Sequence, residues 1–334
     1  MIISELGEFG LIDLLASTIA PQIYKPEVLL GIGDDTAAWR EQGGTLLATT
    51  DTMVQGVHFD STSTWKELGW KAIAINLSDI AAMGGIPQYA LISLCLPRDM
   101  EVEDITKTYE GIGEAASQFE VSIVGGNISS APVISITLTI IGKARNDALL
   151  SRSSAKPGEC IAVTGYLGSS SAGRIMLHRN LQLSVEETSY LRNSHLKPWP
   201  RIAEGHLLVD EGVRTCIDIS DGLMSDLTHI CNASGVRATI DVDRIPIHPT
   251  VKESFGLEAT NLALGGGEDY ELLFSANQRI ITNIQQQSKY PITVIGDISD
   301  GPPGQITLLN VRNDTLKNAQ GGWDHFIAER IDES

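Results

Sequence analysis

Carboxylates stand beside Gly, Ser or Thr at four places in the chain where an apolar run ends. The four segments are GIGDD (31–35), LLATTDT (46–52), NLSD (76–79) and IDISDG (217–222). A single aspartate in such a place is most often a solvated turn or the end of a strand. Oxygen donors without soft ligands suit Mg²⁺, however, so four such segments that converge would form a cradle for several cations.

Asp79 stands in a segment, residues 65–83, that is apolar almost throughout. The spacing predicts a helix that ends at Gly84 and Gly85. Asn76 and Asp79 are three residues apart on this helix. The carboxylate of Asp79 therefore lies at a position where the pattern predicts a buried apolar side chain. Because an unpaired buried charge is costly, we expect Asp79 to meet a cation.

The motif D-x-S-D-G at 218–222 is the most specific local signal. A strand over 215–219 would point Asp218 and Ser220 to the same face. Ser220 or Asp221 would then cap a helix over 223–231. A capped helix with no further role is the alternative interpretation.

Two glycine-containing segments could contact phosphate. Gly-Gly-Asn at 125–127 is expected to follow a strand over 121–124, and glycine there allows a close approach of the backbone to a ligand. GSSSAGR at 168–174 has the spacing of a phosphate loop, but Arg174 and Ile175 replace the Lys and the Ser or Thr that contact phosphate and Mg²⁺. We therefore reject a P-loop and expect tight packing. The spacings of dinucleotide-binding, serine-hydrolase and zinc sites do not occur.

Helices and strands alternate on both sides of a polar segment, residues 144–158, which we interpret as a join between domains. The expected helices cover 5–20, 65–83, 102–119, 170–178, 185–194, 200–210 and 223–231. The expected strands cover 45–50, 89–96, 121–124, 133–141, 160–163, 215–219, 238–242, 270–274 and 305–310. This pattern predicts α/β or α+β layers, with one domain over 1–150 and a second over 151–334.

The composition restricts the class of protein. A chain of 334 residues can build two cores, and 42% hydrophobic against 20% charged residues indicates a globular protein. The net charge of −18 disfavours binding to nucleic acid or to anionic membranes. The start lacks a secretory pattern, the four cysteines are scattered, and the apolar stretches are too short to span a bilayer. We expect a protein of the reducing cytoplasm.

Taken together, the acidic segments resemble the thiamine-monophosphate kinase family. Further similarity lies in GVHF (56–59), GGGEDYEL (265–272) and GWDHF (322–326), so the resemblance runs nearly end to end. The wider superfamily includes aminoimidazole ribonucleotide synthetase and selenophosphate synthetase. The resemblance implies the aminoimidazole ribonucleotide synthetase-like fold of two α/β domains, an ATP site in the cleft of each subunit, and a homodimer joined through the N-terminal domains.

The resemblance also implies roles for single residues. The implied Mg²⁺ ligands are Asp35, Thr49, Thr50, Asp51, Asp79, Asn127, Asp218 and Asp221. The implied ATP contacts are Gly126, Asn127, Arg152 and Ser220, and the implied thiamine-phosphate pocket is His58, Glu268 and Trp323. Catalysis is expected to depend on Asp51, Asp79, Asp218 and Asp221. The family most often has Asp where this chain has Asn127, so a weaker metal contact is expected there.

The implied reaction transfers a phosphoryl group from ATP to thiamine monophosphate and gives thiamine diphosphate and ADP. The acceptor is a phosphate oxygen with a second pKa of about 6, so it is largely ionised at neutral pH and needs no general base. Several Mg²⁺ ions would offset the repulsion between two anions during direct, in-line transfer. Trp323 could stack on the cationic ring system or simply cover an interface. Two alternatives stay open, namely a sibling enzyme with another acceptor and a non-catalytic nucleotide-binding homologue.

Overall fold

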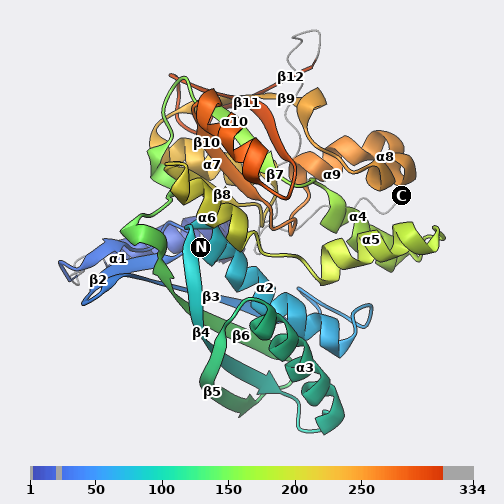
Figure 1. Cartoon of the computed structure of the whole chain (residues 1–334). Helices are drawn as coiled ribbons and strands as arrows, with labels where there is room; N and C mark the ends of the chain where they lie inside the picture. The colour runs from blue at the N-terminus through green and yellow to red at the C-terminus, as the bar shows by residue number, and fades with distance from the viewer. Residues whose placement is uncertain (1–2, 20–24, 311–334) are drawn as a thin grey trace.

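The computed structural model describes residues 3–19 and 25–310, which build two six-stranded sheets with helices packed on them (Figure 1). The chain completes the first sheet before it begins the second. The segment between Ala144 and Cys160 joins the two sheets and carries two short 3-10 helices, η1 (Arg145–Asp147) and η2 (Arg152–Ser154). A domain boundary between residues 150 and 151 falls in this segment and stays a prediction.

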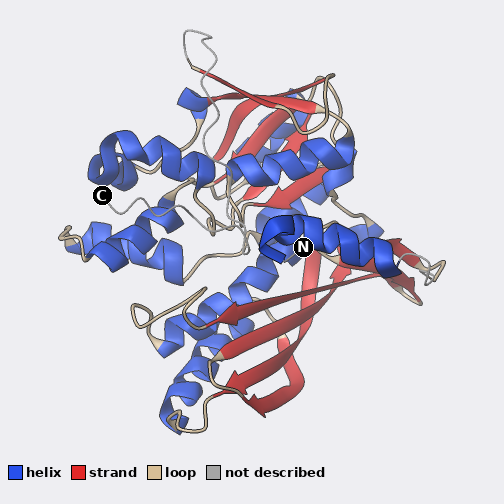
Figure 2. Cartoon of the chain, turned by 180° about the vertical axis from the view of Figure 1, so that it is seen from behind, coloured by secondary structure: helices blue, strands red, loops and turns tan. Residues whose placement is uncertain are grey.

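The first sheet has the strand order β1-β2-β3-β6-β4-β5. Its strands are β1 (Val28–Leu30), β2 (Ala37–Glu41), β3 (Gly44–Val54), β4 (Gly85–Leu96), β5 (Ser122–Ser130) and β6 (Ser135–Ala144). Neighbouring strands are antiparallel, except for the parallel pair of β4 and β5. Helices α2 (Trp65–Ala82) and α3 (Val102–Gln118) cover one face (Figure 2). Alternate residues of β6 are buried on that face, and within residues 3–19 and 25–310 no helix covers the other face of the sheet.

The second sheet has the strand order β12-β9-β11-β7-β10-β8. Its strands are β7 (Cys160–Thr164), β8 (Thr215–Asp218), β9 (Arg237–Asp241), β10 (Leu272–Ala276), β11 (Ile292–Ser299) and β12 (Ile306–Leu309). The helices of this half are α4 (Ser169–Arg179), α5 (Val185–Leu196), α6 (Ile202–Asp210), α7 (Leu223–Ser234), α8 (Pro249–Phe255), α9 (Ala259–Gly265) and α10 (Gln278–Gln287). Helices α4, α7 and α9 pack on one face and α6 and α10 on the other, so this sheet is buried on both sides.

Helix α2 belongs to the first half but packs against α6 and β8 of the second half as well. The helix begins at a capping box in which Thr64 and Glu67 bond each other's backbone N–H. Gly205 of α6 lies so near α2 that a Cβ atom there would stand 2.2 Å from the Ala81 carbonyl oxygen. Burial from several sides explains why the sequence of α2 is apolar almost all round.

Most predicted helices and strands are confirmed, with ends that differ by a few residues. Helix α5 begins at a capping box formed by Ser184 and Glu187. Two predicted strand ends are wrong, because β3 continues through Asp51 to Val54 and β5 continues through residues 125–127 to Ser130. The sequence pattern did not predict strands β1, β2 and β11 or helices α8, α9 and α10. It also did not predict the two short helices η3 (Val242–Arg244) and η4 (Gly256–Glu258).

Helix α1 (Ile3–Ile19) contains a break at Gly7, where φ is 74°. Its bounds agree with the helix predicted over 5–20. Within the described residues, no helix has both the length and the apolar composition needed to cross a membrane.

Candidate active site

Three of the expected metal ligands meet where the two halves of the molecule touch. Asp35 lies in the turn before β2, Asp79 in the last turn of α2, and Asp218 at the end of β8. Their carboxylate oxygens all lie within 4.8 Å of one another. Asp35 is 8% exposed and Asp218 only 2%. Three of the four acidic segments therefore supply a carboxylate to one buried group, which we call the carboxylate cluster.

Two hydroxyl groups orient the carboxylate cluster. Thr49 Oγ1 donates a hydrogen bond of 2.5 Å to Asp79 Oδ2. Ser78 Oγ donates one of 2.6 Å to Asp218 Oδ2. Because Ser78 and Asp79 are neighbours on α2, the end of this helix is tied to a strand of each sheet.

Arg152 brings a positive charge into contact with the cluster. Its guanidinium forms an ion pair with Asp35, and its backbone N–H donates to Asp34 Oδ2 over 3.3 Å. The Asp35 Oδ2 atom is buried and has no hydrogen-bond partner among the described residues. One carboxylate oxygen is therefore left open toward an additional ligand.

Burial and mutual repulsion make the acids of this region hard to ionise. Burial, with Asp35 as the next cause, raises the pKa of Asp218 to about 8. Burial, followed by the charge of Asp51, raises the pKa of Asp79 well above its ordinary value. The pKa of Asp34 is raised to about 7, chiefly by burial and then by Asp35. A divalent cation would reverse this effect, and the hard oxygen donors with one open carboxylate oxygen fit such an ion.

Asp51 borders the cluster from β3. Its backbone N–H donates to Asn76 Oδ1 over 3.0 Å, which ties the strand to α2. Side chains alternate along a strand, so Thr49 and Asp51 point to the face that α2 covers. The fourth acidic segment thus borders the group formed by the other three.

Thr50 points to the opposite face of the sheet. Its Oγ1 donates to the Leu138 carbonyl over 2.9 Å and accepts from Thr139 Oγ1 over 3.0 Å. The Thr50 side chain therefore lies away from the carboxylate cluster, and only its main chain shares the cluster's surroundings.

Gly126 and Asn127 lie on β5, at the exposed edge of the first sheet. Both help to line a cavity of about 310 Å³ on the face without helices, together with Leu91, Ile92, Ser93, Thr137 and Thr139. Strands β6 and β4 separate β3 from β5, which puts Asn127 three strand spacings, or roughly 14 Å, from Asp51. A single chain therefore does not bring Asn127 to the carboxylate cluster. A Cβ atom at Gly126 would stand 1.8 Å from the Ile92 carbonyl oxygen, so the strand pairing alone requires glycine here.

Asp221 belongs to a second group of possible ligands, with Asp226 and His229 of α7. Their ligand atoms also lie within 4.8 Å of one another. Asp226 Oδ2 accepts from the backbone N–H groups of Asp221 (3.2 Å) and Gly222 (3.0 Å). The predicted capping of this helix by Ser220 or Asp221 is wrong, because the N-cap residue is Gly222 and Asp226 binds the free N–H groups instead. The acidic residue in the first helical turn was the signal that could have revealed this contact.

Glu268 lies in the loop between α9 and β10. Its Oε1 atom is 2.8 Å from Lys71 Nζ of α2, and its Oε2 atom is 3.4 Å from His195 Nδ1 of α5. Its backbone N–H donates to the Ser220 carbonyl over 2.7 Å. The expected ATP contact at Ser220 and the expected substrate contact at Glu268 are therefore adjacent in space.

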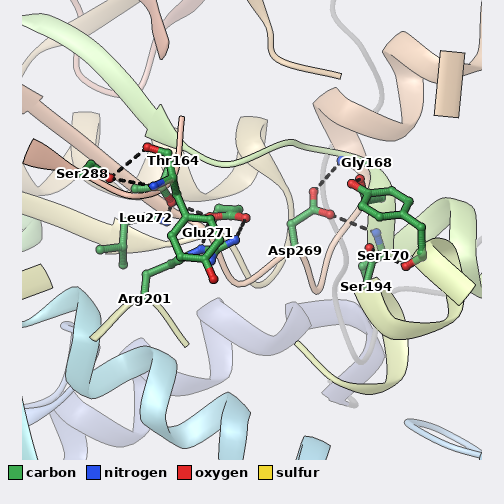
Figure 3. A network of polar contacts seen from close by, with 12 residues as sticks. Thr164, Gly168, Ser170, Ser194, Arg201, Asp269, Glu271, Leu272 and Ser288 are labelled. Carbon is green, nitrogen blue, oxygen red and sulfur yellow. Dashed lines mark hydrogen bonds and ion pairs between the residues drawn. The ribbon is translucent and has the colours of Figure 1, made fainter. Parts of the chain in front are cut away.

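Asp269 explains the phosphate-loop-like segment at 168–174. Its carboxylate accepts from the backbone N–H groups of Gly168 (2.6 Å) and Ser170 (3.1 Å), as Figure 3 shows. Burial, the largest cause, raises the pKa of Asp269 to about 7 against these lowering hydrogen bonds. The N-terminus of α4 is thus occupied by a side chain of the protein itself, which agrees with the rejection of a P-loop.

Glu271 anchors the other end of the same loop (Figure 3). It accepts from Arg201 Nε over 2.6 Å and from Thr164 Oγ1 over 2.5 Å. Arg201 in turn lies over the ring of Tyr290, 3.6 Å from its centroid. These contacts fix the loop of residues 266–271 to the second sheet.

The remaining two expected substrate residues differ in what the structure describes. His58 lies half-buried in the turn after β3, where its Nδ1 atom accepts from the Val54 backbone N–H over 3.0 Å. Trp323 lies outside the described residues.

Comparison with known proteins identifies the class. Residues 33–144 match the model "AIR synthase related protein, N-terminal domain", and residues 156–302 match "AIR synthase related protein, C-terminal domain". The chain thus carries both domains of the AIR synthase-related class.

Similarity to individual proteins identifies the family within this class. The chain is 35% identical over 330 residues to a thiamine-monophosphate kinase of Aquifex aeolicus, a match that covers 98% of this chain and 100% of the relative. It is 35% identical to the Bacillus subtilis enzyme of that name, with 94% and 98% covered. A solved structure described as "AaThiL complexed with AMPPCP and TMP" matches with a TM-score of 0.86 and 34% identity, over 97% of this chain and 99% of that one. The chain belongs to the thiamine-monophosphate kinase family.

Proposed function

We propose that this protein phosphorylates thiamine monophosphate with ATP and releases thiamine diphosphate and ADP. Similarity to thiamine-monophosphate kinases over nearly the whole chain supports this activity, as does the similar structure that holds an ATP analogue and TMP. The observation in this chain that carries the proposal is the carboxylate cluster. Its acids outnumber the cations that contact them, which suits a site that receives metal-bound phosphate.

We propose Mg²⁺ as the cation. The residues that would hold it are Asp35, Asp79 and Asp218, with Asp51 and the hydroxyl of Thr49 beside them, and Asp221 of the second group is a further candidate ligand. Bound Mg²⁺ would neutralise charge on the phosphate oxygens of both substrates. Arg152 would keep Asp34 and Asp35 in place and add positive charge near Asp218.

The acceptor needs little chemical help from the protein. Its phosphate oxygen is already ionised at neutral pH, so no side chain has to remove a proton. Glu268, His58 and Trp323 are proposed to bind the thiamine portion, with the Glu268 carboxylate toward the positive charge. The protein would then act by positioning the acceptor and by holding cations, which is how enzymes promote phosphoryl transfer.

We also propose a homodimer that forms through the uncovered face and edge of the first sheet. Exposed hydrophobic side chains gather there, among them Tyr89, Val124 and Ile128, the last 70% exposed. An apolar sheet face with an open edge strand favours contact with another chain. Because Gly126 and Asn127 cannot reach the cluster of their own chain, they would serve the site of the partner subunit.

Mixed dimers test this arrangement. Asp79→Asn and Asn127→Lys variants should each be poorly active alone. When the two are mixed and refolded together, a dimer of one of each carries one site with both residues intact, so activity should return. No recovery on mixing, in a protein that sediments as a dimer of 36.0 kDa chains, would show that Asn127 acts within its own chain or not at all.

The activity itself is tested with purified protein, ATP, Mg²⁺ and a panel of phosphate acceptors, with the product separated by chromatography. Conversion of thiamine monophosphate to the diphosphate is the expected result. Turnover of another acceptor alone would indicate a sibling enzyme, and nucleotide binding without turnover would indicate a non-catalytic homologue.

The four cysteines are free thiols, which supports the expectation of a cytoplasmic protein.

A further inference from the structure

Lys71 is a buried lysine in the middle of α2, and its sequence context gave it no role. Its side chain is 3% exposed, and its Nζ atom lies 2.8 Å from Oε1 of Glu268, whose side chain is 29% exposed. Lysine is almost never fully buried unless it is paired. The ion pair also joins the two halves of the molecule, since Lys71 lies on α2 and Glu268 precedes β10.

Lys71 supplies the positive charge that contacts Glu268. His195 Nδ1 lies 3.4 Å from Glu268 Oε2 and 3.1 Å from Ser170 Oγ, but burial and then the charge of Lys71 lower the pKa of His195 to about 3. The imidazole is therefore neutral at pH 7. Arg174 adds a weaker attraction. Burial alone would raise the pKa of Glu268. Opposing charges hold this pKa below its ordinary value, and the charge of Lys71 contributes most to the lowering.

The backbone of Glu268 is fixed as well. Its φ of 65° lies in the left-handed region, which a non-glycine residue adopts only when its surroundings require it. The hydrogen bond from its N–H to Ser220 and the neighbouring contacts of Asp269 supply that constraint. Main chain and side chain are thus both restrained at a partly exposed carboxylate, which is typical of a binding site.

We propose that Lys71 is a positioning residue for the acceptor, which holds the Glu268 carboxylate in one orientation for the cationic part of thiamine monophosphate. The inference rests on the proposed function. Lys71 does not itself contact the substrate, because its ammonium group is buried while Glu268 is partly exposed. Removing Lys71 should therefore affect binding of the acceptor and leave binding of ATP unchanged.

The first test is the Lys71→Met variant. Its KM for thiamine monophosphate should rise about 10- to 100-fold, by analogy with the loss of an outer partner that orients a metal ligand, and its KM for ATP should stay within about twofold. The ratio of variant to wild-type acceptor KM should also fall as the pH rises from 6 to 8, because Glu268 without its counter-charge ionises later. The acceptor's own titration cancels in this ratio. An equal rise in both KM values would indicate a merely structural role and overturn the proposal.

Lys66→Met is the matched control. It makes the same change on the same helix, where Lys66 pairs with Glu114 at the surface over 2.9 Å. Neither KM value should change by more than about twofold. A control that weakens acceptor binding as much as Lys71→Met does would also overturn the proposal.

A double-mutant cycle shows whether Lys71 acts through Glu268. In a Glu268→Gln background, Lys71→Met should add less than about twofold to the acceptor KM, because the charge that Lys71 positions is already gone. If Lys71→Met alone does not fold, the double variant can still be compared with Glu268→Gln, because the double variant leaves no unpaired carboxylate. A further tenfold rise in that background would overturn the inference. If the wild type does not use thiamine monophosphate, the proposed function fails, whereas an active wild type with an unchanged Lys71→Met variant refutes this inference alone.

Discussion

Replacing Asp79 by Asn should stabilise the metal-free protein at alkaline pH and abolish its catalysis. Asn has nearly the shape of Asp, can still accept the hydrogen bond from Thr49 Oγ1, and removes one charge from the carboxylate cluster. Asp51, Asp218 and Asp35 all repel the carboxylate of Asp79. The protein keeps this arrangement for function, so we expect its stability to improve when one member of the cluster is neutral.

The magnitude follows from the pKa shifts. The pKa of Asp218 rises from 3.8 to about 8, and each pKa unit is worth about 1.4 kcal/mol. Full ionisation of the cluster thus costs several kcal/mol, a cost that the coupled acids share. Removing one charge should return about 1–3 kcal/mol of unfolding free energy. The folded state retains protons that the unfolded chain has lost, so the wild type loses stability as the pH rises from about 4 to about 8. The advantage of the variant should be largest at pH 8 and small near pH 5.

Denaturant unfolding in the presence of a chelator, at pH 5, 6.5 and 8, measures this difference. The control is Asp99→Asn, which removes a charge from an exposed turn and should change little. Added Mg²⁺ should stabilise the wild type more than the variant, because the ion binds the folded state. A variant less stable than the wild type at pH 8 without metal would refute the reasoning, since Asp79 would then be a satisfied partner of Thr49.

Three further expectations can be checked with single measurements. Asn127→Asp restores the charge common in the family, so its activity should saturate at a lower Mg²⁺ concentration, and an unchanged titration would show that residue 127 does not tune the metals. Trp323→Ala should weaken acceptor binding by up to about 2 kcal/mol, near thirtyfold in KM, and leave ATP unaffected; a rise in the ATP constant alone would place Trp323 at the nucleotide. Transfer should be direct, so protein incubated with labelled ATP alone and then denatured should retain no stoichiometric label.

The sequence predicted the members of the carboxylate cluster better than their orientation. Asp35, Asp79 and Asp218 were recognisable because each interrupts or ends an apolar run, and the structure brings them together. The placement of Thr50 was not accessible, because strand β3 runs further than its Thr-rich sequence suggested. Which face of the sheet a residue joins depends on the pairing of β3 with β6 and on the side that α2 covers.

Contacts between distant segments account for the remaining differences. Lys71 gave no signal, since a lysine inside an apolar helix is explained only by Glu268 far along the chain. Asp226 was overlooked because a carboxylate in a first helical turn is common for reasons of helix polarity alone. Strand β5 was cut short in the prediction because its two glycines suggested a close approach of the backbone to a ligand after the strand, whereas Gly126 is needed for the close approach to β4.

The continuity of α2 would give the proposed acceptor site a fixed length. Lys71 and Asp79 are eight residues apart on one helix, a rise of about 12 Å at 1.5 Å per residue, and a buried hydrogen-bonded helix does not stretch as a loop does. A molecule whose cation lies at Glu268 and whose phosphate lies at the carboxylate cluster has to span that distance. With the acceptor bound as proposed, thiamine without a phosphate would leave the end at the carboxylate cluster empty, and the diphosphate would carry one phosphate more than that end accommodates. Helix α2 would then select the monophosphate by its length and promote release of the diphosphate product.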